Sequence, residues 1–454
     1  MRIGMYESFI TAYCFSSEAK RIWSDTATLQ GWLDVEVALA KAQAELGMIP
    51  TSAAEVIESK ADAALFDIQK LADDIAFSQH SLVPVLHQFE ALCGEPAAGY
   101  IHWGATTQNI FDTTVSVQMA KTHRLLLKEL DATIASLSKL ALAHKATPMA
   151  GRTHGQHALP MTFGYRVAGW IDDLDRQRGR LVERFGPSFP TLMGGAIGTY
   201  GATGRQGREV EALVAKRLGL LPNPLPFRSS YDRVADYCTT LGALAATVEK
   251  FGTSIVFLMR TEIGEVAEAF HMGKMGSSTM AQKRNPNTAM TMIGIARLLR
   301  SKVPLVLEAI IRTDEGDGSS SFVTDVLLPE IGILALSLGE ILAKISRGLT
   351  ADETALRRNL AVSNGLIASE TAMMNMAREI GRHEAHHVLY EAAQRAQSEK
   401  IPFLTAIREH AFFKTHPIPA DLPRWLDPET NVGESVALTE DTVKRALDNA
   451  ANVG

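Results

Sequence analysis

Apolar residues recur along this chain with the period of an α-helix. In residues 241–258 they are separated alternately by three and four positions, at Leu241, Leu244, Val248, Phe251, Ile255 and Leu258. Residues 126–141 contain a second run with spacings of three and four. Such spacing is typical of a helix that packs one narrow stripe against neighbouring helices. No alternating apolar and polar run of similar length occurs, so we expect an all-α chain built around a bundle of long helices.

Stretches rich in glycine and proline interrupt the helical pattern and are typical of loops. They cover residues 94–98, 187–207, 221–226 and 314–321. Shorter helical segments with several prolines begin near Gly348. A chain of 454 residues is too long for one simple core. We predict three domains: an N-terminal helical domain (residues 1–110), a central helical bundle domain (111–350) and a C-terminal helical domain (351–454).

Composition narrows the possible partners and compartment. The formal net charge of −6 provides no basic surface for nucleic acid. The three cysteines, Cys14, Cys93 and Cys238, have no metal-ligand or CxxC spacing, which is typical of a reducing compartment. No stretch approaches the roughly 20 apolar residues of a membrane span, and the N-terminus has no signal-peptide pattern. We therefore expect a soluble, cytoplasmic protein that binds neither nucleic acid nor a membrane.

Residues 102–113 form the first of three polar segments that lie at the edges of predicted helices. Thr106, Thr107 and Asn109 place short hydrogen-bonding side chains just before a helix. Free backbone N–H groups at a helix N-terminus also attract carboxylates. An ordinary helix cap made by Thr107 or Asp112 would have the same composition. The spacing alone leaves both interpretations open.

The second polar segment, residues 151–160, contains His154 and His157 beside an arginine. Two histidines three positions apart on a helical turn could bind a metal ion. No carboxylate or third histidine stands at a matching offset, so we predict no metal site. Since imidazole titrates near neutral pH, His154 is a candidate for proton transfer. The alternative is a buried or capping histidine.

The third polar segment, residues 276–290, combines hydroxyl, cationic and amide side chains. Ser277 and Ser278 follow a glycine, and Lys283 and Asn285 come a few residues later. A glycine-bearing loop can close over a substrate and exclude water. The segment lacks the spacing of a P-loop. Its side chains suit a site that holds and deprotonates a dicarboxylate.

In their order along the chain and in the residues within each, the three segments resemble the fumarase/aspartase superfamily. The resemblance is strongest to adenylosuccinate lyase and bacterial 3-carboxy-cis,cis-muconate cycloisomerase. The resemblance covers nearly the whole chain. It includes Gln30-Gly-Trp-Leu-Asp-Val-Glu36, Gly151-Arg-Thr-His154, Thr261-Glu-Ile-Gly-Glu-Val266, Gly276-Ser-Ser-Thr-Met280 and Lys283-Arg-Asn-Pro286. It implies a homotetramer whose long helices form a core of about 20 helices. It also implies active sites shared between subunits and chemistry without a metal or organic cofactor.

The resemblance implies roles for three catalytic residues. Ser277 matches the loop serine that acts as the base. His154 matches the histidine that protonates the leaving group or orients the substrate. His80 falls where adenylosuccinate lyases place another catalytic histidine. The residues expected to bind the substrate and its developing charge are Thr106, Thr107, Asn109, His102, Ser278, Lys283 and Asn285.

Departures from the family pattern bear on the substrate. Ala281 and Gln282 replace a usual proline and histidine, and Met290 replaces a usual glutamate. Adenylosuccinate lyases bind the nucleotide phosphate with cationic side chains and residues next to them. At the matching positions this chain has Tyr13, Cys14, Ser230, Tyr231, Gly316 and Asp325. Each lost charge-assisted contact removes about 1.5–3 kcal/mol. Cleavage of a purine nucleotide is therefore disfavoured.

We predict a lyase that reversibly eliminates an amine from an N-substituted aspartate or aminopolycarboxylate and releases fumarate. The first alternative is a lactonising 3-carboxy-cis,cis-muconate cycloisomerase. Adenylosuccinate lyase and a non-catalytic structural homologue are further alternatives. The sequence leaves open the leaving group, the stereochemistry and, because of Met290, the general acid.

Overall fold

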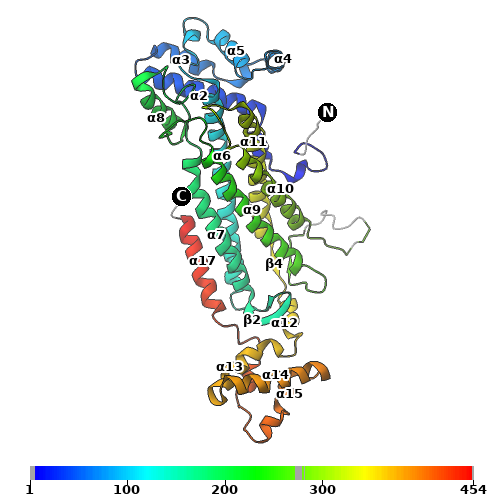
Figure 1. The fold of residues 1–454 in the computed structure, drawn as a ribbon. Coiled ribbons are helices and arrows are strands. Elements are labelled where there is room, and N and C mark those ends of the chain that lie inside the picture. Colours follow the sequence, from blue (N-terminus) through cyan, green and yellow to red (C-terminus); the bar gives the residue numbers. More distant parts are fainter. Residues whose placement is uncertain (1–5, 271–278, 281, 452–454) are drawn as a thin grey trace. The chain divides into compact units, whose positions relative to one another are not determined.

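The computed structural model of the chain describes residues 6–270, 279–280 and 282–451 and is mostly helical (Figure 1). The all-α prediction is confirmed. The described residues divide into two compact units. Unit 1 comprises Met1–Glu129, Gln177–Glu249 and Thr291–Ile341, and unit 2 comprises Leu130–Arg176, Lys250–Met290 and Leu342–Gly454. The division into three domains at residues 110 and 350 stays a prediction.

Five long helices contribute residues to both units: α6 (Thr107–Ala143), α7 (Phe163–Ser188), α9 (Asp232–Leu258), α10 (Asn287–Glu308) and α11 (Gly318–Gly348). The remaining α-helices of unit 1 are α1 (Ser17–Ile22), α2 (Asp25–Glu45), α3 (Thr51–Lys60), α4 (Ile68–Ser78), α5 (Val83–Cys93) and α8 (Gly207–Leu218). Its 3₁₀ turns are η1 (Ala12–Cys14), η2 (Ala63–Leu65), η3 (Ala97–Tyr100) and η4 (Gly204–Gln206).

Unit 2 adds shorter helices and two small antiparallel ribbons. The helices are α12 (Glu353–Ala361), α13 (Ser369–Ile380), α14 (Arg382–Glu399), α15 (Phe403–Arg408), α16 (Leu422–Trp425) and α17 (Ser435–Ala451), with 3₁₀ turns η5 (Leu366–Ala368) and η6 (Ala411–Lys414). The ribbons pair β1 (Pro148–Thr153) with β2 (Gln156–Thr162), and β3 (Val266–Ala267) with β4 (Thr350–Ala351).

The predicted apolar stripes are buried. Every residue of the stripe on α9, from Leu241 to Leu258, is at most 1% exposed. The stripe on α6, from Leu126 to Ala141, is buried to the same extent. Burial of these side chains is the main driving force that orders the long helices, because helix propensity alone is weak.

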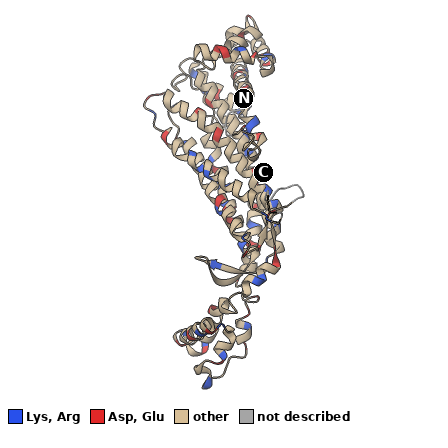
Figure 2. Cartoon of the chain, turned by 90° about the vertical axis from the view of Figure 1, so that its right-hand side faces the viewer, with Lys and Arg blue, Asp and Glu red and all other residues tan. Residues whose placement is uncertain are grey.

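Among the described helices, α9 and α11 are long and apolar enough to span a membrane by length and composition. In the most apolar window of α11, 72% of the residues are buried within the protein. Core helices of soluble proteins have this character, and we interpret both helices in that way. Figure 2 shows acidic and basic residues interspersed along the helices.

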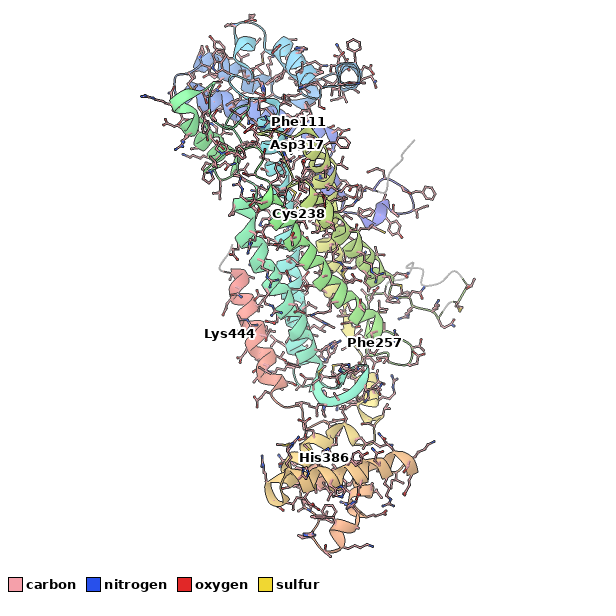
Figure 3. The ribbon with its side chains drawn as sticks, viewed as in Figure 1. Phe111, Cys238, Phe257, Asp317, His386 and Lys444 are labelled. Atoms are coloured by element: carbon pink, nitrogen blue, oxygen red, sulfur yellow. The ribbon has the colours of Figure 1, made fainter. Side chains whose placement is uncertain are left out.

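The loop predicted at residues 314–321 is wrong in its second half, because α11 begins at Gly318. Asp317, labelled in Figure 3, caps this helix. Its carboxylate accepts hydrogen bonds from the backbone N–H groups of Ser319 (2.9 Å) and Ser320 (3.2 Å). The side-chain hydrogen bond from Ser319 and these backbone bonds lower the pKa of Asp317. An aspartate at this position stabilises the first turn.

Candidate active site

The predicted site residues fall in both units. His80, His102, Thr106, Thr107 and Asn109 belong to unit 1, whereas His154, Lys283 and Asn285 belong to unit 2. Ser277 and Ser278 lie outside the described residues.

A reciprocal cap forms the turn that precedes α6. The Thr106 N–H donates to Asn109 Oδ1 (3.0 Å), and the Asn109 N–H donates to the Thr106 carbonyl (2.8 Å). The cap is thus made by Asn109, not by Thr107 or Asp112 as the sequence suggested. Asn109 is fully buried, and its amide also donates to the Gly195 carbonyl (3.5 Å). Asn109 therefore holds the turn, while Thr106 and Thr107 are left half-exposed.

His102 lies in the same turn and is held by Glu36 of α2. One carboxylate oxygen of Glu36 lies 2.6 Å from His102 Nδ1, and the other accepts the His102 backbone N–H at 3.1 Å. The Glu36 side chain is only 2% exposed, compared with 20% for the imidazole. The backbone of His102 is left-handed, with φ of 59°. Glu36 thus fixes both the main chain and the ring at a conformation that few residues adopt.

The contact with Glu36 also determines which ring nitrogen of His102 carries a proton. A carboxylate can only accept hydrogen bonds, so Nδ1 must be the donor. Nε2 is then an acceptor in the neutral ring and a second donor in the imidazolium. Glu36 is a functional candidate that sequence spacing did not identify, because it lies 66 positions from His102.

His80 precedes α5 and is half-buried. Its Nδ1 accepts the backbone N–H of Val83 at 3.2 Å. Because Nδ1 accepts, the proton of the neutral ring resides on Nε2. His80 and His102 are therefore held in opposite tautomers.

In unit 2, the second polar segment is a β-hairpin. The interpretation of His154 and His157 as neighbours on a helical turn is therefore wrong. Thr153 pairs with Gln156, and the two residues between them, His154 and Gly155, have φ of 52° and 78°. Two central residues with positive φ match the twist of a tight hairpin, and histidine tolerates this conformation better than branched residues. His154 is exposed at the tip, and no described side chain or backbone group hydrogen-bonds to its ring.

A buried ion pair anchors the base of this hairpin. Arg152 donates to both oxygens of Glu265, at 3.0 and 2.5 Å. The Asn359 amide donates to the same carboxylate at 2.8 Å. Glu265 is fully buried, and these hydrogen bonds offset the free-energy cost of removing its carboxylate from water. Next to this pair, burial lowers the pKa of His157, and Arg152 lowers it further.

Lys283 and Asn285 stand just before α10. The Lys283 side chain is exposed. The Glu268 carboxylate accepts the N–H groups of Thr288 (3.2 Å) and Ala289 (2.7 Å) and so caps this helix. Met290, in the first turn, is 54% exposed. The position of the missing glutamate therefore carries an exposed thioether.

A second polar cluster of unit 1 surrounds Asp112 on α6. The carboxylate accepts hydrogen bonds from Gln108 (2.6 Å) and the Tyr231 hydroxyl (3.0 Å). Burial nevertheless raises the pKa of Asp112. The Arg312 guanidinium lies 3.7 Å from the centre of the Tyr231 ring. In the sequence, Tyr231 stands out only as a departure from the family pattern. Its contacts with Asp112 and Arg312 are not predictable from that departure.

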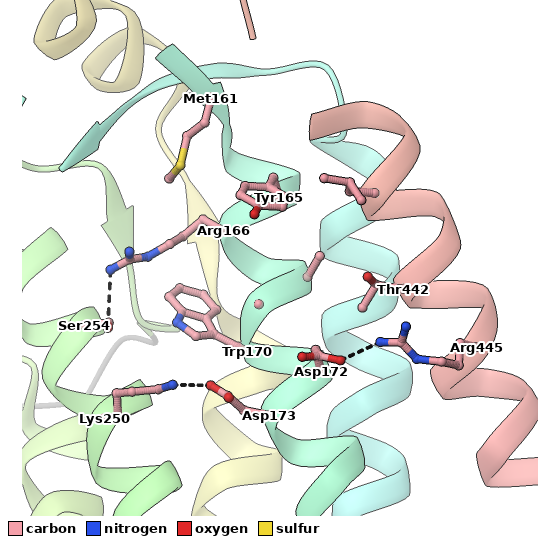
Figure 4. A pocket seen from close by; sticks show the side chains of 13 residues that line it. Met161, Tyr165, Arg166, Trp170, Asp172, Asp173, Lys250, Ser254, Thr442 and Arg445 are labelled. Atoms are coloured by element: carbon pink, nitrogen blue, oxygen red, sulfur yellow. Dashed lines mark hydrogen bonds and ion pairs between the residues drawn. The ribbon is translucent and has the colours of Figure 1, made fainter. Parts of the chain in front are cut away.

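A cleft of about 730 Å³ opens in unit 2 between β2, α7, α9 and α17 (Figure 4). Four of its charged side chains form ion pairs, Asp172 with Arg445 (2.5 Å) and Lys250 with Asp173. Arg166 donates to Ser254 at 3.4 Å. None of the predicted site residues that the structure describes lines this cleft. We do not assign the predicted chemistry to it.

Comparisons with known proteins agree with the resemblance. A family model described as "Lyase" matches residues 15–299, and a model described as "Adenylosuccinate lyase C-terminus" matches residues 365–442. The N-acetyl-S-(2-succino)cysteine lyase of Enterococcus italicus is 36% identical over 92% of each chain. The 3-carboxy-cis,cis-muconate cycloisomerase of Pseudomonas aeruginosa is 34% identical over 94% of each chain.

A solved structure is also closely similar. The fumarate lyase from Mesorhizobium sp. BNC1 superimposes with a TM-score of 0.87 at 31% identity. The match covers 95% of this chain and 98% of that one. The similarity therefore extends over almost the entire fold.

Proposed function

Because the chain belongs to the fumarase/aspartase superfamily, in the branch of adenylosuccinate lyase and muconate cycloisomerase, we propose that it cleaves a substituted succinate by β-elimination and releases fumarate. The base removes a proton from the carbon next to one carboxylate. The C–H electrons form the double bond, and the substituent on the neighbouring carbon leaves with its bonding pair. One observation carries the proposal: Glu36 fixes His102 beside a turn suited to binding a carboxylate.

The difficulty of this reaction lies in the intermediate, since a C–H bond beside an ionised carboxylate is a weak acid. Donors placed where the second negative charge develops supply much of the rate. We assign this task to Lys283 and Asn285, and the base to Ser277. A neighbouring cation makes a serine alkoxide easier to form. His102 and Thr106 bind the substrate in this scheme.

We propose a thiol as the leaving group, with an S-(2-succino)thiol as the substrate. The name of the relative from Enterococcus italicus supports this choice. A second argument is chemical. Thiols have a pKa of about 8.5 and leave as thiolates near neutral pH, whereas an amine must first be protonated. Met290 stands in place of the usual glutamate, and the ring of His154 has no partner within the described part of the chain. Both features suit a leaving group that needs little proton assistance.

Cleavage of a C–N bond, the expectation from the sequence, is the second candidate. The serine–lysine–asparagine signature supports both leaving groups equally. Lactonisation of a carboxymuconate is a third, supported by the relative from Pseudomonas aeruginosa. We further propose a cytoplasmic homotetramer with active sites shared between subunits. The exposed tip that carries His154 supports this assembly, because an exposed catalytic histidine needs a neighbour to exclude water.

The test is to supply the purified protein with three substrates and to follow the products. These are S-(2-succino)-N-acetylcysteine, an N-substituted aspartate such as iminodisuccinate, and 3-carboxy-cis,cis-muconate. We expect fumarate from the thioether at the highest kcat/KM. Fumarate from the amine alone would reverse the choice of leaving group. Lactone formation without any fumarate would overturn the elimination.

Replacement of the proposed base is the matched control. Ser277→Ala should abolish fumarate release while the circular dichroism spectrum and Tm stay unchanged. Undiminished turnover would remove Ser277 from the role of base. The same comparison separates an enzyme from a non-catalytic homologue, which would show no turnover in the unaltered protein either.

A further inference from the structure

Arg228, in the segment between α8 and α9, has an incompletely satisfied guanidinium. Its Nη1 donates to the Ala196 carbonyl. Its Nε is buried without a hydrogen-bond partner, and Nη2 makes no hydrogen bond within the described residues. Arg228 forms no ion pair with a described carboxylate. The Nε–Nη2 edge, which in other arginines binds carboxylates through two parallel hydrogen bonds, therefore has no partner among the residues that the structure describes.

The guanidinium of Arg228 fills the space above Gly316. A Cβ atom added to Gly316 would lie 3.2–3.4 Å from the guanidinium atoms. A longer side chain at position 316 would have to displace Arg228. The chain thus lacks an arginine at position 316 but brings a guanidinium to the same place from a different segment.

Arg228 adjoins the turn that carries the predicted substrate-binding residues. Ala196 accepts from Arg228, and the preceding residue, Gly195, accepts from the Asn109 amide at 3.5 Å. Gly195 has φ of 80°, and a Cβ there would lie 3.8 Å from the Gly104 carbonyl oxygen. One glycine-containing loop therefore separates Arg228 from the turn before α6.

Arg312, another arginine of this region, already lies near acidic groups. Burial raises the pKa of both Asp112 and Asp325, and Arg312 opposes that increase in each case. Of these two carboxyl groups, only Asp112 has a pKa that is lowered by the charge of Arg228. Next to Arg228, a cavity of about 50 Å³ is also lined by Ser230, whose hydroxyl has no partner among the described residues. Its volume matches a small group and not a nucleotide.

We propose that Arg228 binds a carboxylate on the leaving group. The enzyme then selects succinates whose substituent is an amino-acid derivative, joined through sulfur or nitrogen, over those whose substituent is uncharged. The inference rests on the proposed elimination and adds a specificity residue to it. A carboxylate beside the guanidinium accepts a charge-assisted hydrogen bond from Nη2, and the Ser230 hydroxyl supplies a further donor.

The test compares two substrates that differ only in this carboxylate: S-(2-succino)-N-acetylcysteine and S-(2-succino)-N-acetylcysteamine. The unaltered protein should prefer the first by roughly 10- to 100-fold in kcat/KM, the range expected for one charged hydrogen-bonded contact. Arg228→Gln should remove this preference and leave turnover of the cysteamine substrate within about threefold. Arg228→Lys should restore part of it. Lys216→Gln, which removes an exposed charge from α8, is the matched control.

Binding of the leaving group alone tests the inference independently of turnover. Calorimetric titration should show that N-acetylcysteine binds more tightly than N-acetylcysteamine, and that Arg228→Gln abolishes the difference. This result would support the role of Arg228 even if no fumarate were released, which would overturn only the proposed reaction. Equal losses with both ligands, or no loss with either, would overturn the assignment of Arg228.

Discussion

His102 and His154 share an unusual backbone but differ in what holds the imidazole. Both have positive φ, 59° and 52°. His102 is fixed through Nδ1 and its backbone N–H by the buried Glu36. His154 stands at an exposed hairpin tip, and the described residues provide its ring with no partner. Within one chain, therefore, the fold fixes the orientation of the His102 ring, whereas no described residue holds the ring of His154.

The largest effect expected from this difference concerns His154 and the leaving group. With an N-linked substrate, His154→Asn should lower kcat by roughly 100- to 10,000-fold, because loss of a general acid has this magnitude. With an S-linked substrate the loss should be below about tenfold, since a thiolate departs without a proton. Steady-state kinetics with the two substrates checks the prediction. An equal loss with both would show that His154 acts on the succinate half.

The second prediction concerns the base of the same hairpin. A buried ion pair holds this base, whereas His154 at the tip has no partner among the described residues. Glu265→Ala leaves the Arg152 guanidinium buried and unpaired, and we expect a loss of about 3–5 kcal/mol in stability. Thermal denaturation should show a lower Tm, and limited proteolysis should cut the hairpin. Glu262→Ala, an exposed glutamate three positions earlier, is the control and should change little. An unchanged Tm for Glu265→Ala would show that the ion pair does not anchor the hairpin.

The third prediction tests whether Glu36 acts through His102. The backbone N–H of His102 and its Nδ1–H occupy both oxygens of Glu36, but glutamine offers one oxygen and one NH₂. Glu36→Gln should therefore shift the ring proton to Nε2 and raise KM, with a loss in kcat/KM of about 10- to 100-fold. Glu55→Gln, exposed on α3, is the control.

A double-mutant cycle separates this positioning role from a merely structural one. In a His102→Asn background, Glu36→Gln should cause little further loss in kcat/KM. Partial rescue by Glu36→Asp would agree, because aspartate retains two acceptor oxygens. Fully additive losses would instead mean that Glu36 acts on the fold and not on the histidine.

The long helices were predictable because their signal is local. The stripes on α6 and α9 repeat every three or four residues, and the same residues are buried. The hairpin was missed since its turn places histidine where Asn-Gly would have been recognised. Glu36 and Glu265 were missed for another reason. They meet His102 and Arg152 across 66 and 113 positions, and such long-range pairs leave no spacing signal in one sequence.

A third histidine provides the last and smallest effect, because its ring is buried without a carboxylate. His123 on α6 stacks against Phe185 and lies 2.9 Å from the Tyr237 hydroxyl. Burial, together with the charge of Arg124, lowers its pKa to about 4. The neutral ring is therefore favoured in the folded protein. As the pH falls below about 6.5, the unfolded chain binds this proton first, and stability decreases until the pH approaches the folded value.

For His123 this linkage amounts to a loss of about 2 kcal/mol in stability at pH 5 relative to pH 7.5, whereas buried carboxyls with raised pKa, such as Asp325, act in the opposite direction. His123→Gln should show a smaller decrease between the two pH values, although its Tm at pH 7.5 is also lower. His102→Asn is the comparison variant, because the His102 ring is only half-buried and its Nδ1 contacts a carboxylate. The two variants could instead change the pH dependence of Tm in the same way. The difference between a ring held by a carboxylate and a ring buried among aromatic side chains would then not explain the acid sensitivity.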